Sequence, residues 1–147
     1  MINVTKSYLP PLNEYVGYLE KLWASGWLTN HGPLVQELEE KLAAYLGVPY
    51  IHYVSNGTIA IQIALRALGI KGEVITTPFS YVATTNSILW EHSQPVFVDI
   101  DKSTFCIDVK KIEAAITERT QAILAVHVYG RPSNVREIER IAQKYNL

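Results

Sequence analysis

Short apolar runs alternate with helical repeats along the chain from about residue 50 onward. Helical spacing occupies residues 109–117 and 134–146, and the second stretch begins at Asn134 with Glu137 three residues later, a start like a capping box. Four runs have the length and composition of strands: Ile51–Val54, Glu73–Thr77, Pro95–Ile100 and Ala122–Val128. The last two are apolar nearly throughout, which is typical of strands buried on both faces. This alternation predicts βαβ units and an α/β fold with a mostly parallel sheet flanked by helices.

The first 50 residues follow a different pattern. Residues 12–24 and 34–46 have the spacing of helices, and Pro33 suits a first helical turn. The segment between them, "ASGWLTNHGP", holds Trp27 among glycine, threonine and asparagine. Two interpretations are open for it: a surface loop that packs its tryptophan, or a lip over a ligand site.

Composition narrows the class of protein. The chain has 147 residues, about one domain, with 48% hydrophobic and 18% charged residues, as expected of a globular core. A net charge of −1 and the lack of a basic helix argue against a nucleic-acid partner. A single cysteine, Cys106, offers neither a disulfide nor a metal cluster. No signal peptide and no apolar run of roughly 18 residues is present, so we expect a cytoplasmic protein without a membrane partner.

A small polar loop, Ser55–Thr58, precedes a long and almost uncharged helical run. Polar residues fall only at Thr58, Gln62 and Arg66, four apart, so they share one stripe of a largely buried helix. The free amides and the dipole of such a helix N-terminus suit a phosphate-sized anion. A simple helix cap remains an alternative. A hairpin turn at Asn-Gly is a weaker one, because the following run is too long and helical for a return strand.

A second candidate region follows the strand at residues 73–77. Phe79 and Tyr81 come directly after Pro78 and alternate with small hydroxyl residues. An aromatic side chain at this strand end is usually part of the core. It can also stack on a planar ring in the crevice where α/β folds bind ligands.

Several segments together resemble the DegT/StrS family of PLP-dependent nucleotide-sugar aminotransferases. In order they are "SGWLTNHGPLVQELEEKLAAYLGV", "SNGTIAIQIAL", "GEVITTPFSYVATTNSILWEHSQPVFVDID" and "AILAVHVYGRPSNVREIERIAQKYNL". The resemblance implies a fold-type I, aspartate aminotransferase-like large domain, of which this chain holds the N-terminal part. Residues 1–48 would form N-terminal helices and a substrate-side loop. Residues 49–147 would begin the PLP-binding domain, with its remainder and the small domain absent.

The resemblance also implies which residues bind the cofactor, pyridoxal 5'-phosphate. Gly57 and Thr58, with Ile59 alongside, would offer donors to its phosphate. Tyr81 would stack on the pyridine ring, and His127 would lie near the cofactor at a strand end.

Other positions are implied to face the substrate. Trp27 and Asn30 fall in the family's substrate-side loop, and Tyr129 follows His127 in "VHVYG". Asp99 and Asp101, in "VDID", are interpreted as turn residues and not as catalytic ones.

The chain lacks two groups that the resemblance calls for. One is the Schiff-base lysine and the other a carboxylate facing the pyridine nitrogen, both of which the family carries after residue 147. None of the eight lysines (6, 21, 41, 71, 102, 110, 111 and 144) stands in a matching context. We therefore expect no catalytic residue within this chain, no metal site, weak or absent PLP binding, and no activity of the chain alone.

The implied reaction is amino transfer, with glutamate as donor, onto a keto group of a nucleotide-linked deoxysugar in polysaccharide biosynthesis. A homodimer is expected, as in the family. Two alternatives stay open: a PLP-dependent sugar dehydratase, in which histidine replaces the lysine, and a non-catalytic ligand-binding or regulatory relative.

Overall fold

The computed structural model describes residues 5–147, which form two compact units, one ending at Tyr53 and the other spanning Val54–Leu147. The elements, in chain order, are α1 Leu12–Ser25, α2 Pro33–Leu46, α3 Gly57–Ala67, β1 Glu73–Thr76, α4 Ala83–Trp90, β2 Gln94–Phe97, α5 Val109–Ile112, η1 Glu113–Ala115, β3 Thr120–Ile123, η2 Val128–Gly130 and α6 Val135–Tyr145. The helices within residues 5–147 are all too short or too polar to cross a bilayer. The predicted division into residues 1–48 and 49–147 stays a prediction, because these units reflect packing within this chain alone.

The first unit contains the two helices predicted from the spacing of its apolar residues. Pro33 opens α2, where its missing N–H costs nothing. Gly26 and Gly47 end α1 and α2 in the left-handed conformation, with φ of 63° and 65°. Each glycine N–H returns to a carbonyl of the last turn, so both helices stop where glycine accepts this backbone most readily.

The strand predicted at Ile51–Val54 is wrong. No described strand pairs with these residues, and a strand needs a neighbour for its backbone groups. In place of a ladder, the Tyr53 N–H donates to the Glu39 carboxylate at 2.7 Å. The hydrogen bond from His31 Nε2, also 2.7 Å, lowers the pKa of Glu39 below its ordinary value, and the Tyr53 amide adds to this effect.

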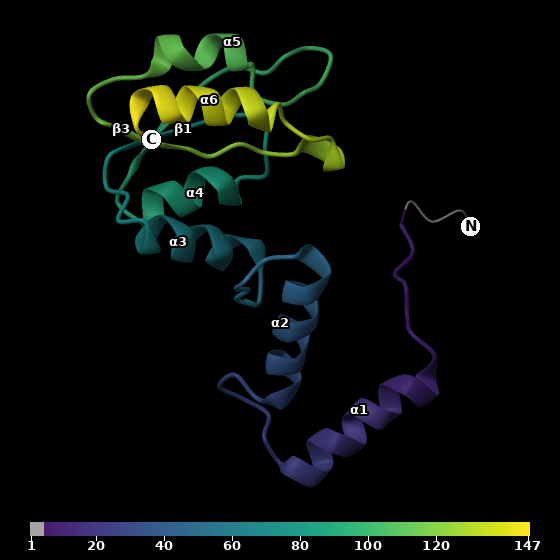
Figure 1. Cartoon of the computed structure of the whole chain (residues 1–147). Helices are drawn as coiled ribbons and strands as arrows, with labels where there is room; N and C mark the ends of the chain where they lie inside the picture. Colours follow the sequence, from purple (N-terminus) through teal and green to yellow (C-terminus); the bar gives the residue numbers. More distant parts are fainter. Residues whose placement is uncertain (1–4) are drawn as a thin grey trace. The chain divides into compact units, whose positions relative to one another are not determined.

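The second unit is built on a parallel sheet with the order β2-β1-β3. The connection through α4 leads from β1 to β2 on one side of it. The connection through α5 leads from β2 back across β1 to β3 on the other side. Right-handed crossovers therefore require α4 and α5 to lie on opposite faces of the sheet. Figure 1 shows this arrangement, with α3 and α4 on one side of the sheet and α5 and α6 on the other. The predicted α/β architecture is confirmed.

Two small cores fill the space between the sheet and its helices. Adjacent residues of β1 point to opposite faces, so Val74 packs with Leu65 of α3 and Ile88 of α4. Ile75 enters the other core, whose buried members are Ile75, Val98, Ile107, Ile112, Ile138 and Ile141. These contacts fix which helix covers which face.

The prediction of full burial for the second and third strands of the sheet is wrong. All four residues of β1 are buried, whereas β2 and β3 are only partly covered. The strand order explains the difference, since β1 lies in the centre and the other two form the edges. Pro95 fits this position, because an edge strand tolerates a residue that cannot donate.

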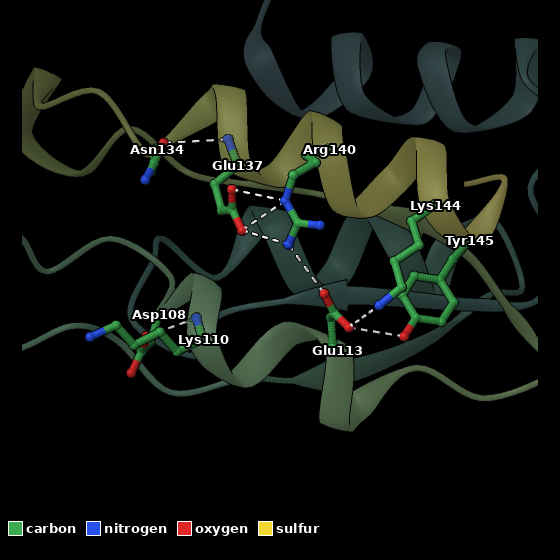
Figure 2. A network of polar contacts seen from close by, with 8 residues as sticks. All are labelled: Asp108, Lys110, Glu113, Asn134, Glu137, Arg140, Lys144 and Tyr145. Carbon is green, nitrogen blue, oxygen red and sulfur yellow. Dashed lines mark hydrogen bonds and ion pairs between the residues drawn. The ribbon is translucent and has the colours of Figure 1, made fainter.

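Helix α6 begins and ends in polar contacts, drawn in Figure 2. Asn134 caps the helix by accepting the Glu137 N–H at 3.4 Å, as predicted. The Glu137 carboxylate turns instead to Arg140, so only half of a capping box forms. At the other end, Glu113 of η1 accepts from Lys144 Nζ at 2.7 Å and Tyr145 Oη at 3.0 Å. This network ties α6 to the segment after α5.

Replacing Glu113 with glutamine should slightly destabilise the chain near neutral pH and make its stability less sensitive to acid. The hydrogen bond from Lys144, followed by that from Tyr145, lowers the pKa of Glu113. A lowered folded-state pKa means that this stabilisation is present above the ordinary glutamate pKa of about 4.3. It is lost as the pH falls through the lower folded-state value.

Urea unfolding at a series of pH values measures this effect. Glu118→Gln is the matched control, because the exposed Glu118 side chain makes no hydrogen bond or ion pair within residues 5–147. Equal acid sensitivity of the Glu113→Gln variant and the wild-type chain would contradict the prediction.

Candidate functional site

The carboxyl ends of β1 and β3 are the candidate ligand site of this sheet. The two strands are neighbours, yet α4 follows β1 on one face and α6 follows β3 on the other. The loops that leave them therefore diverge and open a crevice, which is where open α/β sheets bind ligands. A pocket of about 400 Å³ lies there, lined by residues 78–81 and 126–129. That volume suits a small organic molecule.

Aromatic side chains dominate this pocket. Tyr81 lines it and is 81% exposed, so its ring is turned away from the core. Phe79 stacks on Phe105 with ring centroids 5.7 Å apart and meets the edge of Tyr129 at 6.5 Å. Phe105 and Tyr129 both have a positive φ, of 61° and 53°, which is uncommon for bulky residues. The pocket thus offers flat apolar surface for a planar ring.

Sequence reasoning missed Phe105 as a neighbour of the pocket. It sits in the tight turn after β2, where Asp101 accepts the Ser103 and Thr104 amides at 2.9 and 3.0 Å. The turn folds the ring back onto Phe79, and no local pattern signals that contact. Asp101 acts in this turn, as interpreted from the sequence.

The N-terminus of α3 has two amides without a protein acceptor. Asn56 caps the helix and accepts the Ile59 N–H at 3.0 Å. Within residues 5–147, the N–H groups of Gly57 and Thr58 donate to no protein atom. A Cβ at Gly57 would meet nothing within 4 Å, so a ligand can approach the backbone closely. The cap and the anion site are therefore compatible, because the cap uses one amide and leaves two.

The predicted site residues fall into three places. Tyr81, His127 and Tyr129 line the same pocket. Gly57, Thr58 and Ile59 lie at the start of α3 in the same unit but outside that lining, and Ile59 already donates to Asn56.

Trp27 and Asn30 belong to the first unit, in the loop between α1 and α2. The Trp27 indole N–H donates to the Thr29 carbonyl at 2.6 Å, and Asn30 has a φ of 56°. Their part in a substrate site stays a prediction.

Within the described pocket lining, the ionisable side chains are those of His127, Tyr81 and Tyr129. Three lysines are engaged elsewhere: Lys41 with Glu37, Lys111 with Asp99 and Asp108, and Lys144 with Glu113. No group of His, Cys, Asp and Glu in residues 5–147 is arranged to hold a metal ion.

These features define an α/β domain with an aromatic crevice and a helix N-terminus that leaves two backbone amides free. The chain belongs to the DegT/DnrJ/EryC1/StrS aminotransferase family, which matches residues 12–147.

Individual relatives agree with this assignment. The chain is 56% identical over 146 residues to dTDP-4-amino-4,6-dideoxy-D-glucose transaminase of Escherichia coli. The matched region covers 99% of this chain and 39% of that protein. The structure of NtdA from Bacillus subtilis with bound cofactor PMP superimposes with a TM-score of 0.88, at 40% identity, over 92% of this chain and 32% of that one. DesI, solved with its TDP-sugar product, gives 0.88 at 35% identity over 93% of this chain and 35% of that one.

These comparisons confirm the predicted family and fold class. The chain spans only 32–39% of the length of these three proteins.

Proposed function

We propose that this chain supplies the phosphate- and ring-binding part of a PLP-dependent aminotransferase. The reaction is amino transfer, with glutamate as donor, onto a keto group of a nucleotide-linked deoxysugar. The observation that carries the proposal is the pair of unpartnered amides at Gly57 and Thr58, on the same unit as an aromatic crevice. Family membership supplies the class of reaction.

The residues present fit the cofactor's two binding groups. The amides of Gly57 and Thr58, with the Thr58 hydroxyl, are donors for a dianionic phosphate, and the α3 dipole adds to their attraction. The exposed Tyr81 ring offers a face for the pyridine ring, and His127 offers a polar group at the same pocket. When bound, PLP supplies an electron sink for exchanging an amino and a keto group. The chain's own part is to bind and orient it.

The described pocket offers no amine and no carboxylate to complete this chemistry. Its lining contains neither lysine nor an acidic residue. Lys71 precedes β1 and so lies at the opposite end of that strand from the pocket. We infer that the chain alone does not catalyse transamination and holds the cofactor without a covalent bond.

The identity of the relatives supports a substrate class. The name of the Escherichia coli relative specifies a 4-amino-4,6-dideoxyglucose carried on dTDP, and the DesI structure holds a TDP-sugar. We propose a nucleotide-linked keto sugar as substrate and an amino sugar of this kind as product, with Trp27, Asn30 and Tyr129 on the substrate side. We also propose a homodimer in the cytoplasm, the compartment that suits a lone reduced cysteine such as Cys106.

Borohydride reduction of the chain mixed with PLP should label no single lysine selectively. The exposed lysines compete for the aldehyde with no single preferred site, because none of them lines the described pocket. Peptide mapping measures the distribution of label, and Lys71 and Lys102 serve as internal references for exposed amines. One stoichiometrically labelled lysine, together with a stable absorption band before reduction, would contradict the proposal.

A further inference from the structure

All polar groups of Ser133 make hydrogen bonds, two of them to the segment after β3 and one to the start of α6. Its backbone N–H donates to His127 Nδ1 at 3.1 Å, and its hydroxyl donates to the Val126 carbonyl at 2.9 Å. Its own carbonyl accepts the Val135 N–H at 2.7 Å, and the residue is only 5% exposed. A buried residue therefore holds the segment between β3 and η2 that carries His127, which lies four residues beyond the end of β3 and not at a strand end as predicted.

The loop between these residues is closed by its own backbone. The Gly130 N–H donates to the His127 carbonyl at 3.1 Å, and the Arg131 N–H donates to the Val128 carbonyl at 2.9 Å. Directly after Ser133, Asn134 caps α6, which Ile138 and Ile141 anchor in the core. The orientation of the His127 ring is thus tied to the packed part of the unit.

The bond from Ser133 decides which imidazole nitrogen carries the proton. A backbone N–H is only a donor, so Nδ1 must present a lone pair to accept from it. In neutral His127 the proton therefore resides on Nε2, which makes no hydrogen bond within residues 5–147. The nitrogen left for a ligand is a donor.

We propose that Ser133 is a positioning residue that fixes His127 as an Nε2–H donor toward an acceptor oxygen of the ligand in the pocket. The tautomer follows from this chain's own contacts. The donor role toward the cofactor rests on the proposed function. A planar ligand with an acidic or carbonyl oxygen beside its ring matches this combination of stacking tyrosine and imidazole donor.

Long-range proton–nitrogen NMR spectra of the ¹⁵N-labelled chain without cofactor report the tautomer directly. At about pH 8, above the ordinary histidine pKa of about 6.5, His127 should show an unprotonated Nδ1 and a protonated Nε2 in a single form. His92, whose ring makes no hydrogen bond within the described chain, is the internal reference for a tautomer mixture. A protonated Nδ1, or the same mixture as His92, would overturn the proposal even if the chain binds the cofactor.

Two variants distinguish the effect of the Ser133 backbone N–H on the His127 tautomer from that of the Ser133 hydroxyl. Ser133→Ala keeps the backbone N–H and should keep the single tautomer, whereas Ser133→Pro removes that N–H and should give a mixture. Should the proline variant fail to fold, His127→Asn and His127→Gln replace it. The asparagine amide can occupy the Nδ1 position and should keep the Ser133 amide protected from hydrogen exchange, while glutamine should not. Equal Ser133 exchange rates in these two variants would overturn the proposal.

Adding pyridoxamine phosphate tests the donor role itself. The Nε2 resonance of His127 should move in the wild-type chain and move less in Ser133→Pro. If the Gly57 and Thr58 amides respond to the ligand but Nε2 does not, the donor role is wrong while the proposed function stands. If no resonance responds, the proposed function fails while the tautomer result stands.

Discussion

Replacing Gly57 with proline should weaken the binding of pyridoxamine phosphate about tenfold or more. The substitution deletes one of the two free amides at the start of α3. A hydrogen bond to a charged group contributes about 1.5–3 kcal/mol, and about 1.4 kcal/mol corresponds to a tenfold change in affinity. Proline is compatible with this first helical position, and Asn56 before it is already extended, with φ −165° and ψ 165°. The helix should therefore survive the change.

Gly57→Ala is the matched control, because it adds a side chain but keeps the backbone N–H. A Cβ at this position meets no protein atom within 4 Å, so the alanine variant should fold normally and, with its N–H in place, lose less affinity than the proline variant. Calorimetric titration with pyridoxamine phosphate measures both variants, and this ligand has no aldehyde to react with surface lysines. Equal affinities of the proline and alanine variants would show that the Gly57 amide does not hold the phosphate.

Replacing Gly72 with alanine should destabilise the second unit by about 1–3 kcal/mol, the usual range for overpacking. The added Cβ would lie 2.3 Å from the Arg119 carbonyl oxygen, a backbone atom that cannot simply rotate away. The same carbonyl accepts the Glu73 N–H at 2.8 Å, and Gln121 accepts the Lys71 and Gly72 amides at 2.7 and 2.8 Å. The clash therefore lies where the residue before β1 packs against the residue before β3.

Urea unfolding followed by circular dichroism measures this loss of stability. Gly57→Ala again serves as the control, since a Cβ meets nothing within 4 Å there. The Gly72→Ala midpoint should fall well below that of the control. Equal midpoints of the Gly72→Ala variant and the control would contradict the prediction. They would mean that the segments around Gly72 and Arg119 move apart at little cost in free energy.

Helices α1, α2, α3 and α6 were predictable from sequence because their signals are local, whereas α4 was not among the predicted helices. Spacing of apolar residues, Pro33 at a first turn and Asn134 at a cap lie within one or two turns of the helix that they define. Strands depend on partners elsewhere in the chain. The pattern of Ile51–Val54 is that of a strand, yet no described neighbour pairs with it. Likewise, the sequence does not reveal that β1 takes the centre of the sheet and leaves β2 at an edge.

The candidate site divides in the same way. The loop before α3 and the aromatic residues after β1 were predictable, because free amides and strand ends follow from the element pattern alone. Phe105 was not, since a positive φ in a distant turn brings its ring to Phe79. The bond from Ser133 to His127 was not predictable either, because the loop must close before the amide can reach the ring.

The most direct test of the central claim is an NMR titration of the ¹⁵N-labelled chain with pyridoxamine phosphate and, in parallel, with pyridoxamine. The claim is that α3 binds the phosphate of a ligand whose ring lies at Tyr81. We predict that the Gly57 and Thr58 amides shift with pyridoxamine phosphate and not with pyridoxamine. Resonances of Tyr81 and His127 should also shift with pyridoxamine phosphate. Shifts confined to surface lysines, with the Gly57 and Thr58 amides unmoved, would contradict it.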